Sequence, residues 1–369
     1  MKITDVSVTV WEWKDIPPTR YTRTVTSSRT RSTQMGLLRI RTDDGLEGNG
    51  FLGSALGSAR EDAPFVISTV KPMLMGEDAL ARERIWQNLM RRTRGRMPVV
   101  GAVDVALHDL AGKSAGVPVH RLLGSYRDSV PAYASSAVLD SPEAYAEEAV
   151  RHKEANWGAY KIHPPGIAAE DIRICEAVRK AVGDDYRVML DSTWSYDYPD
   201  AVRVGVAIQE MGFYWYEDPL ANDDLYSYVK LKQALHIPIM ATELPPAGPT
   251  SYAPWVMEQA TDYLRGDVFI KGGITSCMKT AHLAEAFQMN YEVHHGSNSL
   301  NNIANLHMIM AMRNCEFFEV LLPDEVQKHA IVNEIELDGN GHVHAYNDPG
   351  LGAQIDFDLI EANKLADLS

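Results

Sequence analysis

The chain has 369 residues, of which 45% are hydrophobic and 23% charged, a composition that is ordinary for globular proteins and a length that suits a large domain with a smaller one. The net charge of −15 at pH 7 argues against binding to nucleic acid or to an anionic membrane surface. The three cysteines are widely separated and no apolar run is long enough to span a membrane, so we expect a cytoplasmic protein with free thiols.

The first 125 residues predict a small α+β domain. Residues 1–13 alternate between apolar and polar side chains, as in a half-buried strand. A second strand is expected at 35–41, before a turn sequence at 44–45 that is typical of hairpins. The periodicity from 60 to 115 is helical. A few strands followed by helices indicate a capping domain rather than part of a repeating α/β unit.

Two long loops interrupt this domain, at about 14–34 and 48–58. Loops of this length are uncommon in compact domains unless they have a function, and we expect them to determine substrate specificity. The first loop contributes Arg20, Tyr21 and Arg23 as candidate substrate-binding residues, because an arginine-rich loop suits an anionic or polyhydroxylated ligand. A solvated, positively charged loop explains the same composition equally well.

From residue 126 to 320, short apolar runs alternate with amphipathic helical stretches. Eight such runs, which we interpret as strands, lie at 130–136, 159–163, 187–191, 213–217, 238–242, 267–271, 291–295 and 316–320. The remaining segment, 321–369, returns to strand and turn character and is expected to pack on the first domain. The predicted fold is therefore α/β: a modified, TIM-like (β/α)8 barrel with an N-terminal α+β capping domain that the C-terminal segment completes.

Three of the predicted barrel strands end in an acidic residue. Asp191, Glu217 and Glu243 follow apolar runs, and each lies 26 residues after the one before it, which is one strand and one helix. Adjacent strands of a barrel bring such residues together at its C-terminal mouth. Converging carboxylates repel unless a cation neutralises them, and oxygen ligands suit Mg²⁺, with Mn²⁺ as a substitute. Three isolated helix caps are the alternative, but the equal spacing favours a metal site.

The second barrel strand carries Lys161 and His163, two residues apart and therefore on one face. A lysine inside a barrel is costly unless it neutralises an opposite charge. Both residues are candidates for acid–base catalysis, and a counter-charge to the metal carboxylates is the alternative for Lys161. Ser135, on the first strand, is a candidate for binding substrate.

The seventh strand ends in two histidines, of which only one can face the mouth. We expect this to be His295, the residue before Gly296, while His294 points away and is kept only as a candidate for binding substrate. Asp267, near the opening of the sixth strand, could accept a hydrogen bond from the catalytic imidazole and raise its basicity. Glu319, on the eighth strand, is a candidate proton donor.

Together these residues resemble the mandelate racemase-like subgroup of the enolase superfamily, over essentially the whole chain. The three equally spaced acids match the subgroup's metal ligands, and Asp267 with His295 matches its Asp–His dyad. Segments 106–113 and 348–352 are similar to the parts that join the cap to the barrel and close the barrel onto the cap.

The resemblance implies Mg²⁺-dependent removal of the α-proton of a hydroxylated carboxylate, with the enediolate stabilised by the metal. Lys161-x-His163 matches the subgroup's Lys-x-Lys position, but the histidine argues against racemisation through a second lysine. This favours a carbon–oxygen lyase that dehydrates a sugar acid to a 2-keto-3-deoxy acid. A cycloisomerase acting on an anhydro-sugar acid, a racemase or epimerase, a barrel metal hydrolase and a non-catalytic binding barrel are the alternatives. The family also implies a homo-oligomer, between a dimer and an octamer.

Overall fold

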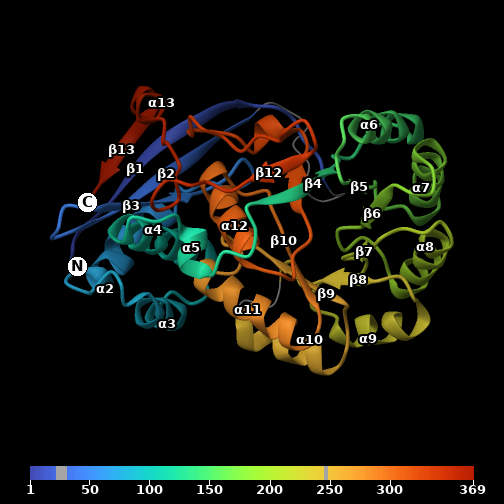
Figure 1. The fold of residues 1–369 in the computed structure, drawn as a ribbon, viewed down its shortest axis with the longest axis horizontal. Coiled ribbons are helices and arrows are strands. Elements are labelled where there is room, and N and C mark those ends of the chain that lie inside the picture. Colours follow the sequence, from blue (N-terminus) through green and yellow to red (C-terminus); the bar gives the residue numbers. More distant parts are fainter. Residues whose placement is uncertain (22–30, 245–247) are drawn as a thin grey trace.

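The computed structural model describes residues 1–21, 31–244 and 248–369. It has two parts, a cap formed by the N-terminal third of the chain and a barrel formed by the middle, and both chain ends lie in the cap (Figure 1). No helix within the described residues is both long and apolar enough to cross a membrane.

The cap is built on a four-stranded sheet in the order β13-β1-β2-β3. The strands β1 (Ile3–Ile16), β2 (Arg31–Thr42) and β3 (Glu47–Leu52) form consecutive antiparallel pairs. The last strand of the chain, β13 (Lys364–Leu368), pairs antiparallel with β1. The expectation that the C-terminal segment completes the cap is therefore confirmed.

Helix α4 (Met97–Ala115) is buried along most of its length and joins the cap to the barrel. Its backbone approaches β3 so closely that a Cβ atom on Gly50 would lie 2.3 Å from the carbonyl oxygen of Ala102. Buried Asp109 accepts hydrogen bonds from the N–H groups of Asn49, at 3.0 Å, and Leu351, at 2.9 Å. The other cap helices are α1 (Asp62–Phe65), η1 (Val66–Val70), α2 (Lys71–Leu74), α3 (Arg82–Arg92) and α5 (Val119–Leu123).

The barrel contains eight parallel strands with helices on the outside (Figure 1). In order they are β4 (Ser129–Ser135), β5 (Ala159–Ile162), β6 (Arg187–Asp191), β7 (Tyr216–Glu217), β8 (Ile239–Ala241), β9 (Tyr263–Gly266), β10 (Asn290–Val293) and β11 (Phe318–Leu321). The outer helices are α6 (Pro142–Glu154), α7 (Ala168–Val182), α8 (Tyr198–Glu210), α9 (Leu225–Ala234), α10 (Ala253–Met257), α11 (Ile274–Ala286) and α12 (Ser299–Ala311). Shorter elements are η2 (Pro249–Tyr252), η3 (Asp324–Val326), β12 (His342–His344) and α13 (Phe357–Ala362).

The sixth barrel strand was predicted at 267–271, and this position is wrong. Strand β9 ends at Gly266, and Asp267 begins a turn in which its Oδ1 accepts hydrogen bonds from the N–H groups of Phe269, at 2.7 Å, and Ile270, at 2.9 Å. The apolar run that suggested a strand is thus divided between a buried turn residue, Val268, and two residues that line a cavity. The correction moves Asp267 from the start of the strand to its C-terminal end.

Strands β10 and β11 stand at the two ends of the barrel's strand order. Buried carboxylates link these two strands. Glu292 accepts a hydrogen bond from the N–H of Glu316 at 3.0 Å, and Glu319 accepts one from the N–H of His295 at 3.0 Å. Below the mouth the barrel interior is filled by large side chains, namely Tyr133, Met189, Trp215, Met240 and Phe317. The polar groups above this plug are consequently held away from bulk water.

Candidate active site

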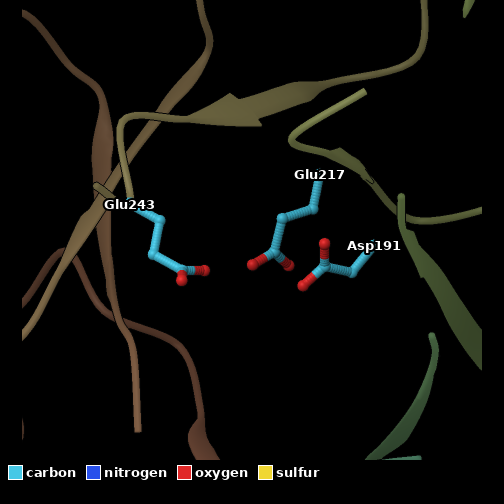
Figure 2. Close-up of side chains that lie close together, drawn as sticks. All are labelled: Asp191, Glu217 and Glu243. Carbon is cyan, nitrogen blue, oxygen red and sulfur yellow. The ribbon is translucent and has the colours of Figure 1, made fainter. Parts of the chain in front are cut away.

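Asp191, Glu217 and Glu243 lie at the ends of three neighbouring strands and point toward one another (Figure 2). One carboxylate oxygen from each lies within 4.8 Å of the others. Asp191 and Glu217 are almost fully buried, whereas the side chain of Glu243 is 13% exposed and lines a cavity. The convergence predicted from their spacing is therefore present, because β6, β7 and β8 end at the same level.

Lys161 lies among these acids and is completely buried. Its Nζ lies 3.2 Å from Asp191, 3.0 Å from Glu217 and 2.7 Å from Glu319. Burial and the nearby Arg265 oppose the charged form, but Glu217 and Glu319 hold the pKa of Lys161 well above its usual value. The lysine therefore provides a permanent positive charge in the site.

Arg265 supplies a second buried cation, to which the sequence analysis assigned no role. Its Nε lies 2.5 Å from Glu217, and its Nη2 lies 2.6 Å from Glu319. It stands on β9 two residues before Asp267, so strand alternation places both on one side of the strand. The sequence contained this signal, but the misplaced sixth strand obscured it.

The net charge of the site matches one divalent cation. When the three acids above and Glu319 are all ionised, they exceed the two permanent cations Lys161 and Arg265 by two negative charges. Burial raises the pKa of Glu217 to about 8 against the opposing effect of Arg265, so added positive charge would favour its ionised form. An all-oxygen donor set is the type that Mg²⁺ prefers. The residues present fit this ion.

His163 lies on the same side as Lys161, as the Lys-x-His spacing predicted, and both contact Asp191. Its Nε2 is 3.0 Å from Asp191, and its Nδ1 is 2.7 Å from the carbonyl oxygen of Ser136. The hydroxyl of Ser135 is fully buried and lies 3.4 Å from the same Nδ1. The structure thus brings Ser135 to the histidine ring, whereas it was expected to face the substrate.

The predicted pairing of Asp267 with His295 is wrong, because the partner of Asp267 is His294. Nδ1 of His294 is hydrogen-bonded to Oδ2 of Asp267, and the ring of His294 lines the same cavity as Glu243. Strand β10 carries Glu292 on its interior face, and alternation then places His294 rather than His295 on that face. Alternation along the strand therefore holds, whereas proximity to Gly296 does not identify the interior histidine.

His295 lies on the opposite side of β10, with 1% of its surface exposed. Its ring packs against Phe318, with centroids 4.1 Å apart, and burial lowers the pKa of His295 to about 3. The imidazole is therefore neutral and does not border the cavity that His294 lines. Its backbone N–H, however, helps to hold Glu319.

Asp267 and His294 form a strongly polarised pair. Burial acts against both charges, yet the hydrogen bond from His294 keeps the pKa of Asp267 below its usual value. Glu243 and Asp267 raise the pKa of His294 to about 9 against the effect of burial. The Nε2 of His294 lies 3.6 Å from Glu243. Because Nδ1 of His294 is bonded to Asp267, its Nε2 is the nitrogen that can exchange a proton with a bound molecule.

A cavity of about 270 Å³ connects these groups. Tyr21 lines it and its ring meets His163 edge-on, with centroids 5.7 Å apart. Arg20 accepts a hydrogen bond at its carbonyl oxygen from the N–H of Val138 but is not a lining residue, and Arg23 lies outside the described residues. The lining residues that the sequence analysis did not single out are Ser54, Leu56, Thr193, Trp194, Leu244, Phe269, Ile270, Gly296, Ser297 and Leu321.

Most of these missed residues lie within three positions after a residue that was predicted. Thr193 and Trp194 come after Asp191, Leu244 comes after Glu243, and Ser297 comes after the two histidines. In a barrel the loops after the strands surround the mouth, so position alone could have identified them.

The protein has a parallel barrel with a cap, and a cluster of three carboxylates lies beside an Asp–His pair. These features define a class of barrel enzymes with acid–base chemistry. Residues 6–124 match the N-terminal domain family of mandelate racemase and muconate lactonizing enzyme, and residues 144–359 match the enolase C-terminal domain-like family. The chain therefore belongs to the enolase superfamily and, within it, to the mandelate racemase-like enzymes.

Individual relatives are similar over nearly their whole length. Arabinonate dehydratase of Saccharolobus solfataricus is 29% identical, covering 88% of this chain and 89% of the relative. D-galactarolactone cycloisomerase of Agrobacterium fabrum is 28% identical, covering 90% and 91%. The crystal structure of D-glucarate dehydratase from Agrobacterium tumefaciens, complexed with magnesium, superposes with a TM-score of 0.87 at 34% identity and covers 99% of this chain and 100% of that one.

The two adjacent histidines provide a direct test of the corrected geometry. We expect His294→Asn to reduce exchange of the substrate α-proton with D₂O by at least about 100-fold, a typical contribution of a general base. His295→Asn, the matched control, should retain exchange within about tenfold of the wild type, because its ring lies outside the cavity. NMR of the recovered acid measures the exchange. An inactive His295 variant beside an active His294 variant would contradict the assignment.

The pH dependence tests the role of Asp267. A base works in its deprotonated form, so kcat/KM should fall as the pH drops through the pKa of His294. Asp267→Asn removes a negative charge that favours the imidazolium, and the acidic limb should therefore move to lower pH by about one unit or more, with a lower maximum rate. Steady-state rates between pH 5 and 10 measure this shift. A limb that stays at the same pH would show that another group titrates.

Proposed function

We propose that the chain is a Mg²⁺-dependent lyase that removes the α-proton of a hydroxylated carboxylic acid and expels its β-hydroxyl as water, giving a 2-keto-3-deoxy acid. The observation that carries this proposal is that the Asp267–His294 pair lines the same cavity as Asp191 and Glu243, whose carboxylates converge with that of Glu217. This arrangement supports a role for the pair as proton acceptor beside a bound cation and the substrate carboxylate.

His294 is the base in this account. Its Nδ1 is occupied by Asp267, so Nε2 takes the proton from the α-carbon. The raised pKa means that the free enzyme holds a proton there near neutral pH. Part of that increase comes from Glu243, and positive charge near Glu243 would weaken it. The base therefore becomes available when the neighbouring carboxylates are neutralised.

Asp191, Glu217 and Glu243 would hold the divalent cation. When bound, Mg²⁺ would supply positive charge against the negative charge that develops on the substrate carboxylate as the α-proton leaves. Lys161, whose charge is fixed and whose side chain lines the cavity, would bind the same carboxylate.

The proton on His294 then passes to the β-hydroxyl, the carbon–oxygen bond breaks and water leaves, which gives an enol that tautomerises to the 2-keto-3-deoxy acid. Glu319 was a candidate proton donor, but its contacts favour a different role. Burial opposes its charge, while Arg265 and Lys161 keep the pKa of Glu319 well below its usual value. It therefore acts as an acceptor that fixes the two cations. His163 also lines the cavity and can exchange a proton with substrate there.

A cycloisomerase is the second candidate, because one relative is a D-galactarolactone cycloisomerase. The first step would be the same, and an internal ring oxygen would leave in place of a hydroxyl. The two reactions differ in mass balance, since elimination from a ring conserves the mass of the substrate.

The proposed reaction is tested by screening sugar acids with Mg²⁺ and measuring the product by mass spectrometry. We expect a 2-keto acid lighter than its substrate by one water. Glu217→Gln should reduce this turnover by at least about 1,000-fold because it removes one of three charges that hold the cation. Glu292→Gln, a buried acid between β10 and β11, is the matched control and should retain turnover.

A product of unchanged mass would identify the cycloisomerase. Undiminished turnover in excess chelator, or in the Glu217 variant, would contradict the proposed function itself.

A further inference from the structure

The cavity has a charged floor and an apolar wall. The floor consists of the acids and bases described above, and all of its predicted catalytic groups come from strand ends. The apolar wall consists of Leu56, Trp194, Leu244, Phe269, Ile270 and Leu321.

The apolar wall reaches the mouth of the cavity. Lys161 is 0% exposed and Asp191 2%, whereas Leu56 and Leu244 are each 42% exposed. Leu56 comes from the cap, in the segment after β3, while Leu244 follows Glu243 on the barrel. The cavity is thus lined by one leucine from the cap and one from the barrel, and both are far more exposed than its buried floor. A substrate whose carboxylate is held at the floor would present its far end to them.

Exposed leucines at this position favour an apolar end of the substrate. Contact with a methyl group removes apolar surface from water on both partners, which is favourable. A hydroxyl in the same place would give up hydrogen bonds to water and receive none from a leucine side chain. A carboxylate would be disfavoured more strongly.

The cationic residues that could pair with a second substrate carboxylate also favour an uncharged far end. Among the described residues that line the cavity, the cationic or basic ones are Lys161, His163 and His294. Each of them is hydrogen-bonded or ion-paired to an acid of the floor. The described wall therefore matches an acid with a single carboxylate.

Buried hydrogen-bonding groups also line the cavity. Within the described part of the chain, Thr193 Oγ1, Trp194 Nε1 and Ser297 Oγ are buried and have no hydrogen-bond partner. All three residues line the cavity. Buried polar groups are normally paired, so these atoms are suited to the hydroxyls on the carbons close to the reacting centre.

We propose that the substrate is a monocarboxylic sugar acid whose far end is a methyl group, that is, a 6-deoxyhexonate. This inference rests on the proposed function, since it takes the carboxylate to be held at the floor. Hydroxyls on the inner carbons then meet Thr193, Trp194 and Ser297, and the terminal methyl lies between Leu56 and Leu244.

The test compares acids of the same configuration that differ only at C6: 6-deoxyhexonates, hexonates and the corresponding diacids, across the hexose configurations. The holoenzyme with Mg²⁺ should show a kcat/KM for the methyl compound about 10- to 100-fold above that for its hydroxymethyl partner, the range that an apolar pocket provides. The diacid should be the poorest of the three.

Variants at the mouth then locate the effect. Leu56→Asn should reduce the preference for the methyl compound at least about fivefold, while Leu56→Met should retain it. Leu122→Asn, at a leucine that is 39% exposed on the cap and does not line the cavity, should leave the preference unchanged. Leu56 is exposed, so none of these changes removes core packing.

Each result decides the inference. Turnover with equal kcat/KM for the methyl and hydroxymethyl acids, or a preference for the diacid, would overturn the methyl end while leaving the proposed function intact. Absence of both turnover and α-proton exchange for every acid would overturn the proposed function and the inference with it. If Leu56→Asn left the preference for the methyl compound unchanged, the apolar wall would not be its source.

Discussion

Repulsion between buried carboxylates is the constraint on which the site depends. Asp191, Glu217 and Glu243 converge at the barrel mouth, in surroundings where an unpaired charge is expensive. Lys161 and Arg265 neutralise part of this charge and hold Glu217 and Glu319 in defined positions. The remaining negative charge makes the site selective for a cation. The electrostatic balance thus links the fold to its chemistry.

The barrel makes this concentration of charge feasible. Parallel strands that end at one level bring the acids together, while the large side chains beneath them exclude water from below. The cap closes the other side, and α4 connects it to the barrel through Asp104, whose Oδ2 accepts a hydrogen bond from the N–H of Thr275 at the start of α11. Cap and barrel are therefore joined by a hydrogen bond, and Leu56 of the cap lines the same cavity as the strand ends.

Much of the fold and the acid group could be predicted from the sequence. Eight strand–helix periods indicated the barrel, and the equal spacing of the three acids predicted their convergence, because period and register repeat along the chain. Lys161 and His163 followed from simple alternation on one strand. These features depend on local periodicity, which a single sequence displays directly.

The errors arose where a choice depended on long-range pairing. Alternation predicted that only one of His294 and His295 faces the interior. Which of the two does so depends on how β10 pairs with β9. The position of β9 was missed because the turn after it contains an apolar run, and Arg265 was missed with it. Its importance comes from contacts with Glu217 and Glu319, residues 48 and 54 positions away in the sequence. Such contacts have no local signature.

The central claim is that one divalent cation is held by acids from three adjacent strands. Crystals grown with Mn²⁺, which scatters anomalously, test it most directly. The account predicts a single strong anomalous peak among the carboxylates of Asp191, Glu217 and Glu243, with Lys161 still in place beside it. A peak elsewhere in the barrel, or none at a Mn²⁺ concentration that supports turnover, would contradict the account.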